Sequence, residues 1–332
     1  MYHARLRGSY ERMGQQQGRP LKRIGFTLPP PEEKMLRFAR RCEEILAQHT
    51  PELLDEIRGL AEAAELDHDA LATLALTAPF DPGKVPSCSI AAVMPGRTVG
   101  GRLIVGRNYD MFYDVSKDGA TTFRTYPQGG NASVGNCDIW VGREDGLNEA
   151  GLFVGMAGIH LPGLKPGLAF WFIVRHILDR CATVDEAVEF IQDAPHAQSA
   201  AYLLADGSGK GVVAETTTEG VELRYPEDGL LILTNHAVCP ALAGKDSEST
   251  CLADSHSRYN RLRESLEGSQ VVDVEAVKQA LSDHEGGVCS HGVDPSGRRY
   301  GTLWSLVGCP GERKLDIAEG HPCRAKYRTV SF

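Results

Sequence analysis

The spacing of apolar residues changes at residues 81–87, and this boundary, the clearest in the chain, constrains the fold more than any other feature. From residue 30 to residue 79 apolar residues recur at helical spacing, whereas from Cys88 onward they fall in short runs typical of β-strands. A turn-rich segment, residues 81–87 (DPGKVPS), separates the two regions. The sequence therefore predicts a helical N-terminal segment over residues 1–87 and a strand-rich region over residues 88–332, which together form one compact unit.

The helical region contains recognisable helix starts. In residues 33–48 the apolar side chains follow i, i+3, i+4, i+7 spacing, as in an amphipathic helix. Thr50 and Pro51 are residue types favoured at the N-cap and first position of a second helix. Asp67 is expected to cap a third helix.

Strand-like runs recur beyond the turn-rich segment, and two helical blocks interrupt them. The runs are Cys88–Met94, Arg102–Val105, Ile139–Val141, Leu152–Met156, Ala200–Ala205, Gly211–Glu215, Val221–Tyr225, Leu230–Leu233 and Leu303–Val307. The helical blocks are residues 168–192, where Thr183 and Glu186 have capping-box spacing, and residues 254–281. Runs of strands followed by runs of helices indicate α+β layers, and no glycine-rich phosphate-binding motif supports a nucleotide-binding fold.

Composition excludes several classes of protein. With 42% hydrophobic and 24% charged residues, a chain of 332 residues can bury a large core, which argues against disorder. The net charge of −9 repels phosphate backbones and anionic lipids, so we expect neither nucleic acid nor a membrane as a partner. Without a secretory leader or a long apolar segment, a soluble cytoplasmic protein is expected. Nine cysteines without a C-x-x-C pair favour reduced thiols.

Cys88 is the first candidate for chemistry. It follows the turn-rich segment, where a cut in the chain would be tolerated. Such a cut would make Cys88 an N-terminal residue, whose thiol attacks and whose α-amino group, with a pKa near about 8, takes and returns the proton. The alternative is a buried structural cysteine.

Polar residues at the ends of strand-like runs are further candidates. Arg107 and Asp110, three positions apart, can hold an amine or polarise a thiol, although a surface salt bridge has the same pattern. Asn148 lies near a turn, and Asn235 follows a buried run, where an amide N–H can stabilise an oxyanion by about 3 kcal/mol. Both asparagines are also common turn residues. Arg258 lies on the second helical block.

A polar cluster near the end of the chain contains His284, Cys289 and His291. Residues at this spacing, in a strand and a turn, could bind one metal ion together, but the cluster does not supply the four ligands that a structural zinc site needs. We therefore expect no metal and no other cofactor.

In their order along the chain, the motifs resemble those of the isopenicillin N acyltransferase family. This family belongs to the N-terminal-nucleophile hydrolases and is related to the choloylglycine (bile-salt) hydrolases and penicillin V acylases. The matching motifs are Gly8-Ser9-Tyr10-Glu11, Ser87-Cys88-Ser89, Gly106-Arg107-Asn108-Tyr109-Asp110, Asp145-Gly146-Leu147-Asn148, Thr234-Asn235-His236, Ser257-Arg258, Asp283-His284-Glu285 and His321-Pro322-Cys323. Each motif is short, and their order over nearly the whole chain makes the resemblance specific.

The resemblance implies a four-layer αββα sandwich, made as a precursor that cuts itself between Ser87 and Cys88. The site residues that it carries over are Cys88, Arg107, Asp110, Asn148, Asn235 and Arg258. It implies that Cys88 is the nucleophile, that Arg107 and Asp110 support its thiol and amine, and that the two asparagines belong to the oxyanion and substrate-orienting shell. Arg258 is then a structural or catalytic residue near the pocket.

The implied activity is hydrolysis of a linear amide or acyl transfer through an acyl-enzyme on Cys88. The partner would be a small-molecule amide or acyl donor, with acyl-CoA or another acyl thioester as a co-substrate. The cut segment is expected to stay bound through its apolar helix faces, and a homo-oligomer is left open. Weaker candidates for the substrate pocket are Phe112, Tyr113, Trp171 and His236, which are equally consistent with ordinary core or rim positions.

Two alternative functions remain. An uncleaved, non-catalytic binding protein of a biosynthetic pathway would suit Ser87, which stands where many relatives have glycine. A papain-like Cys-His protease would pair Cys88 with His236 or His284 as its base. Neither alternative requires a cut before Cys88.

Overall fold

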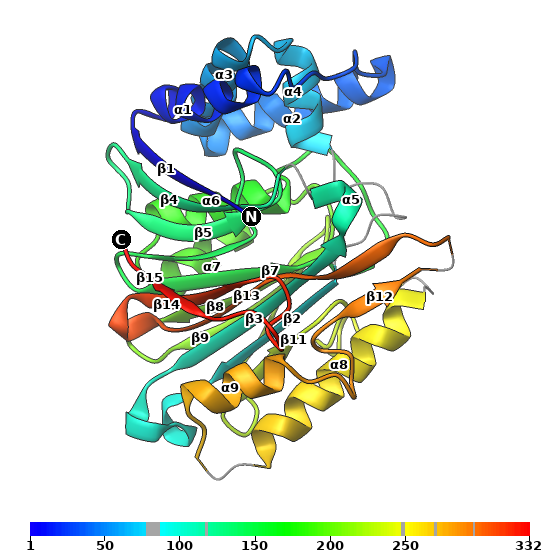
Figure 1. Cartoon of the computed structure of the whole chain (residues 1–332). Coiled ribbons are helices and arrows are strands. Elements are labelled where there is room, and N and C mark those ends of the chain that lie inside the picture. Colours follow the sequence, from blue (N-terminus) through cyan, green and yellow to red (C-terminus); the bar gives the residue numbers. More distant parts are fainter. Residues whose placement is uncertain (78–86, 117–118, 247–249, 269–270, 295) are drawn as a thin grey trace.

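Two β-sheets lie face to face, and helices cover the outer face of each sheet (Figure 1). The computed structural model describes residues 1–77, 87–116, 119–246, 250–268, 271–294 and 296–332. Of the turn-rich segment expected at residues 81–87, all but Ser87 lies outside the described residues. The arrangement confirms the predicted α+β class and the four-layer αββα sandwich.

Sheet A has eight strands in the order β1-β4-β5-β6-β7-β8-β9-β10. Their bounds are β1 (Tyr2–Gly8), β4 (Thr121–Pro127), β5 (Ser133–Cys137), β6 (Asp145–Asn148), β7 (Leu152–Ala157), β8 (Ala200–Asp206), β9 (Gly211–Thr216) and β10 (Val221–Arg224). Strand β1 runs parallel to β4, whereas the other neighbours pair antiparallel. Strand β1 was not predicted, because Leu6 is its one buried residue and leaves no alternating pattern.

Sheet B has seven strands, in the order β11-β2-β3-β13-β14-β15 with β12 beside β13. Their bounds are β2 (Ser87–Val93), β3 (Ile104–Phe112), β11 (Leu230–Leu233), β12 (His291–Val293), β13 (Arg299–Cys309), β14 (Lys314–Glu319) and β15 (Arg328–Val330). The predicted strand at residues 102–105 is therefore displaced and longer, because β3 continues through buried polar residues that an apolar pattern does not detect.

The outer helices are α6 (Phe170–Arg180) and α7 (Val184–Asp193) on sheet A, and α8 (Thr250–Glu267) and α9 (Val274–Leu281) on sheet B (Figure 1). Each predicted helical block is thus two helices. Helix α6 ends at Arg180, because the backbone of Cys181 is extended. The side chain of Thr183 then caps α7, where it accepts a hydrogen bond from the N–H of Glu186 at 3.2 Å.

Four helices of the N-terminal segment, α1 (Tyr10–Arg23), α2 (Glu33–His49), α3 (Pro51–Ala64) and α4 (His68–Thr77), lie together beyond sheet A (Figure 1). Helix α2 begins at Glu33, where the apolar spacing predicted it, α3 begins at Pro51, and Asp67 precedes α4 and accepts from the N–H of Ala70 at 2.9 Å. Helix α1 was not predicted. At Gly14 an added Cβ would lie 2.0 Å from the carbonyl oxygen of Glu56, so glycine lets α1 lie directly against α3.

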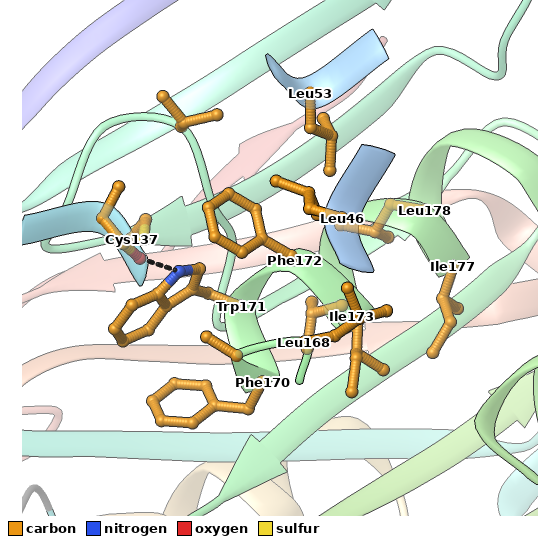
Figure 2. Close-up of a cluster of buried hydrophobic side chains, with 14 of the residues drawn as sticks. Leu46, Leu53, Cys137, Leu168, Phe170, Trp171, Phe172, Ile173, Ile177 and Leu178 are labelled. Carbon is orange, nitrogen blue, oxygen red and sulfur yellow. Dashed lines mark hydrogen bonds between the residues drawn. The ribbon is translucent and has the colours of Figure 1, made fainter. Parts of the chain in front are cut away.

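A large apolar core joins the N-terminal helices to α6 and sheet A (Figure 2). Leu46 of α2 and Leu53 of α3 are fully buried in the same cluster as Phe172 and Leu178 of α6. Each such side chain contributes about 1.5–3 kcal/mol when buried. The N-terminal segment therefore shares its core with the rest of the chain and contributes a strand to sheet A.

Other elements connect these layers. A short helix, α5 (Tyr113–Ser116), follows β3, and 3-10 helices occupy Pro95–Arg97, Val99–Gly101 and Pro310–Glu312. The strand predicted at residues 139–141 is wrong, because these residues form a bend between β5 and β6 whose apolar side chains pack on the core. Among the described helices, none is both long and apolar enough to cross a lipid bilayer.

Candidate active site

Cys88 lies near the start of β2, fully buried, between the strands β3 and β11. Its backbone N–H donates to Oδ1 of Asn235 at 2.8 Å. Its Sγ accepts from Nη2 of Arg107 at 3.4 Å. Both the nitrogen and the sulfur of this residue are therefore held by side chains that the sequence singled out.

Arg107 of β3 links the two sheets behind the thiol. Besides Cys88, its Nη2 donates to the carbonyl oxygen of Met156 on β7 at 3.0 Å, and its Nη1 donates to Asp145 of β6. Asp145 also accepts from the indole N–H of Trp304 at 2.8 Å. This network fixes the guanidinium beside the sulfur, and it makes Asp145 a site residue that the sequence analysis missed although it lies in a motif already noted.

Arg258 of α8 holds the opposite side of Cys88. Its Nη1 donates to the carbonyl oxygen of Cys88 and, at 3.1 Å, to Oγ of Ser89. Its Nη2 donates to Oδ1 of Asn235 at 3.0 Å, and its Nε forms an ion pair with Asp254 at 2.8 Å. Arg258 thus fixes both the backbone of β2 and the amide that binds the Cys88 nitrogen.

Asn235 follows β11 and bridges to the other sheet. While its Oδ1 accepts from Cys88 and Arg258, its Nδ2 donates to the carbonyl oxygen of Gly158 at 2.9 Å. Gly158 begins the segment that follows β7. The Asn235 amide therefore sits between the nucleophile and a loop at the end of a sheet A strand.

Asp110 lies opposite Ser87 in the register of β2 and β3, next to the bond expected to be cut. Its Oδ1 accepts from Oγ1 of Thr302 at 2.6 Å, and among the described residues its Oδ2 has no hydrogen-bond partner. Burial raises the pKa of Asp110 to about 7, against the opposing effects of Arg258 and the Thr302 hydrogen bond. This carboxyl group can therefore change protonation near neutral pH.

The thiol of Cys88 is neutral in the uncut chain. Burial raises its pKa to about 12, and Arg107 opposes this rise. Attack by the sulfur therefore needs a neighbouring group that accepts its proton.

Asn148 has its hydrogen bonds elsewhere and not with Cys88 or the residues that contact it. Its Nδ2 donates to the carbonyl oxygens of Leu178 at 3.1 Å and Cys181 at 2.7 Å, and its Oδ1 accepts from the N–H of Leu152 at 3.0 Å. Both of its N–H groups are thus used by the main chain near the end of α6, which leaves none for an oxyanion.

The aromatic candidates lie in different places. Trp171 is in the core between α6 and the N-terminal helices, where its indole N–H donates to the carbonyl oxygen of Ala75 at 2.9 Å (Figure 2). Phe112 ends β3, Tyr113 begins α5, and both are partly buried. Trp171 is therefore a core residue, whereas Phe112 and Tyr113 remain candidates for the substrate pocket.

The histidines proposed as a protease base have other partners. Nδ1 of His236 lies 2.8 Å from Oγ of Ser255, and burial lowers the pKa of His236 to about 4. His284 lies beside the ring of His291. Among the described residues, the hydrogen-bond partner of the Cys88 sulfur is Arg107, so the geometry does not support a Cys-His pair.

Comparison with known proteins identifies the family of the chain. A family model described as acyl-coenzyme A:6-aminopenicillanic acid acyl-transferase matches residues 97–324, a range that begins after Cys88 and contains Arg107, Asp110, Asn235 and Arg258. The acyl-coenzyme A:6-aminopenicillanic-acid-acyltransferase 40 kDa form of Emericella nidulans is 24% identical over 297 residues, covering 88% of this chain and 81% of that protein.

Two further similarities extend the comparison. An uncharacterized protein of Archaeoglobus fulgidus is 24% identical over 297 residues, which cover 74% of this chain and 49% of that protein, so the chain spans about half of its length. The structure of penicillin V acylase from Agrobacterium tumefaciens matches with a TM-score of 0.53 and 14% identity, over 74% of this chain and 86% of that one. This structural similarity shows a shared fold.

Proposed function

The chain belongs to the acyl-coenzyme A:6-aminopenicillanic acid acyl-transferase family, and from that membership we propose that it is an amidohydrolase or acyltransferase whose nucleophile is Cys88. The observation that carries the proposal is that two atoms of Cys88 are hydrogen-bonded to side chains. Its sulfur lies 3.4 Å from Nη2 of Arg107, and its backbone nitrogen lies 2.8 Å from Oδ1 of Asn235. A residue that uses both its thiol and its own amino group needs partners for both atoms.

The first step is a cut of the Ser87–Cys88 bond by the chain itself. The sulfur of Cys88 attacks the carbonyl carbon of Ser87, the C–N bond breaks, and the thiol proton ends on the Cys88 nitrogen. Asp110 lies opposite Ser87 and titrates near pH 7, so its carboxylate is placed to relay this proton. Water then hydrolyses the resulting thioester, which releases the Ser87 carboxyl group and restores the thiol.

Turnover repeats this chemistry on a substrate. The new α-amino group takes the thiol proton, the sulfur attacks the substrate carbonyl, and the leaving amine or thiol takes that proton as the acyl thioester forms. Asn235 and a backbone N–H stabilise the oxyanion, where one donor is worth about 2.7–4 kcal/mol. Water as acceptor completes hydrolysis, whereas an amine acceptor completes acyl transfer.

The substrate class follows from the family and the relatives. The family description names acyl-coenzyme A and 6-aminopenicillanic acid as the two substrates of an acyl-transferase, and the Agrobacterium tumefaciens structure is that of a penicillin V acylase. We therefore propose a small-molecule linear amide or acyl thioester as the substrate, with no cofactor needed for the acyl-transfer chemistry. The N-terminal segment stays bound after the cut, which its strand in sheet A and its share of the apolar core support.

Intact-mass spectrometry of the freshly purified, denatured protein tests the proposal. Because residues 1–87 are 87 of 332 residues, a cut of the 36.0 kDa chain should give pieces of roughly 9 and 27 kDa. The Cys88→Ala variant should stay intact and inactive, whereas Cys181→Ser, which changes a buried cysteine at the end of α6, should be cut as the wild type is. Normal cutting of Cys88→Ala would refute the assignment, and an intact, inert wild type would favour a binding protein.

A further inference from the structure

Four side chains outside the catalytic set converge beside β12. They are His284 and Cys289 from the segment between α9 and β12, His291 at the start of β12, and Cys323 after β14. Each offers one ligand atom, and these four atoms all lie within 4.8 Å of one another. The sulfurs of Cys289 and Cys323 are each 3.3 Å from Nε2 of His291.

From this convergence we propose that His284, Cys289, His291 and Cys323 form a binding site for a zinc ion. Two thiolates and two imidazoles are a ligand set that tetrahedral Zn²⁺ takes in structural sites. Zn–S bonds of about 2.3 Å and Zn–N bonds of about 2.0–2.1 Å place sulfur and nitrogen about 3.5 Å apart in a tetrahedron. The two 3.3 Å separations are close to that value, so an ion requires only small movements of the side chains.

The surroundings of the four ligands suit a bound ion. The imidazole of His321 stacks on that of His291 with 3.7 Å between ring centroids, and Nε2 of His321 lies 2.8 Å from the hydroxyl of Tyr113. Tyr113 thus positions the His321 ring, and the stacked His321 ring supports one face of the His291 imidazole. His284 and His291 are exposed, so an ion can reach the site from solvent.

The fourth ligand explains why the sequence predicted no metal. His284, Cys289 and His291 are near one another in the chain, but Cys323 comes from a segment 32 residues beyond His291. The ion would thus join two segments distant in sequence, with three ligands from the first segment and the fourth, Cys323, from the second. We accordingly replace the expectation of no metal with one of a structural zinc.

The zinc also bears on the catalytic residues through the main chain. Ser290, which lies between two of the ligands, donates its N–H to Oγ1 of Thr302 at 3.0 Å and accepts from the N–H of Thr302 at 3.2 Å. Thr302 in turn binds Asp110. The ion would therefore fix the segment that supports the Asp110 carboxyl group, while the metal site itself does not depend on the proposed catalytic function.

The metal content of the full-length protein tests this proposal. We expect one zinc per chain by inductively coupled plasma mass spectrometry after expression with added zinc. Cys323→Ser, at a partly exposed position, should lose most of the metal, whereas Cys309→Ser, which changes a buried cysteine on β13 outside the cluster, should keep it. Circular dichroism of each variant separates loss of metal from loss of the fold.

Cobalt substitution of the wild type provides a test that needs no variant. Co²⁺ added to the metal-free protein should give the visible d–d bands of tetrahedral coordination and a thiolate-to-cobalt charge-transfer band. A wild type that holds no zinc and gives neither band would overturn the proposal. A metal-free wild type whose tryptic peptides show Cys289 joined to Cys323, with a mass lower by two hydrogens, would instead identify a disulfide and refute the site.

Discussion

Replacing Thr302 with valine tests whether Asp110 must be ionised for the chain to cut itself. The Thr302 hydroxyl donates to Asp110 at 2.6 Å and accepts from the N–H of Ser290 at 3.0 Å; valine keeps the shape of threonine while removing both hydrogen bonds. Burial already raises the pKa of Asp110 to about 7, and the Thr302 hydrogen bond is one of the interactions that oppose this rise. Without it, the pKa of Asp110 should rise further.

The size of the effect follows from the strength of the lost hydrogen bond. A hydrogen bond to a charged group is worth about 1.5–3 kcal/mol, and 1.36 kcal/mol corresponds to about one pKa unit. The pKa of Asp110 should therefore rise by roughly 1–2 units in Thr302→Val. If the carboxylate relays the proton, the rate of self-cleavage near pH 7 should fall by roughly 5- to 50-fold, because the ionised fraction of Asp110 falls from about one half to between about one tenth and one hundredth.

The assay follows the uncut precursor, kept at low pH where Asp110 is protonated, after transfer to a series of higher pH values. Intact mass gives the rate of cutting at each pH, and the midpoint of the pH profile should shift upward in Thr302→Val. Thr302→Ser retains the hydroxyl and should behave as the wild type does. An unchanged midpoint in Thr302→Val, with normal folding, would refute a role for the ionised Asp110.

Two further variants test the electrostatics and the packing. Both are made in the uncut Cys88→Ala chain, where urea denaturation is a reaction of one molecule. Burial raises the pKa of Asp110 from 3.8 to about 7, so in that pH range the folded state keeps a proton that the unfolded state has lost, and the stability of this chain should fall as pH rises. Asp110→Asn should remove this part of the pH dependence. Gly14→Ala would place a Cβ 2.0 Å from the Glu56 carbonyl oxygen and should lower the free energy of unfolding by about 1–3 kcal/mol. Gly96→Ala, where an added Cβ has no atom within 4 Å, should leave the denaturation midpoint nearly unchanged.

Local signals predicted the parts of the fold that depend on local interactions. Helix α3 begins at Pro51 as expected, and Thr183 caps α7, because capping uses residues a few positions apart. Strand β1 and helix α1 escaped prediction because their stability depends on distant partners, β4 in one case and α3 in the other. Gly14, unfavourable in an isolated helix, is required by that contact.

The candidate site also contains residues that the sequence could identify and residues that depend on distant partners. Position in the sequence made Cys88, Arg107 and Asn235 candidates, the family resemblance gave them roles, and the structure brings their polar atoms together. The partners that position them could not be selected, because Asp145 and Thr302 reach the site from other strands through tertiary pairing. Sequence spacing alone carries no information on which of several polar residues in a motif faces the nucleophile.

The seven-residue pairing between β1 and β4 has a consequence for how the protein is made. A cut between Ser87 and Cys88 would turn a single chain into a heterodimer whose smaller subunit contributes the edge strand β1 to a sheet of the larger subunit. Assembly before the cut is a unimolecular reaction, but reassembly after it depends on concentration, since two separate molecules must meet. Denaturation of the cut protein would then be largely irreversible. Its lifetime would be set by the rate at which the two subunits dissociate rather than by an equilibrium.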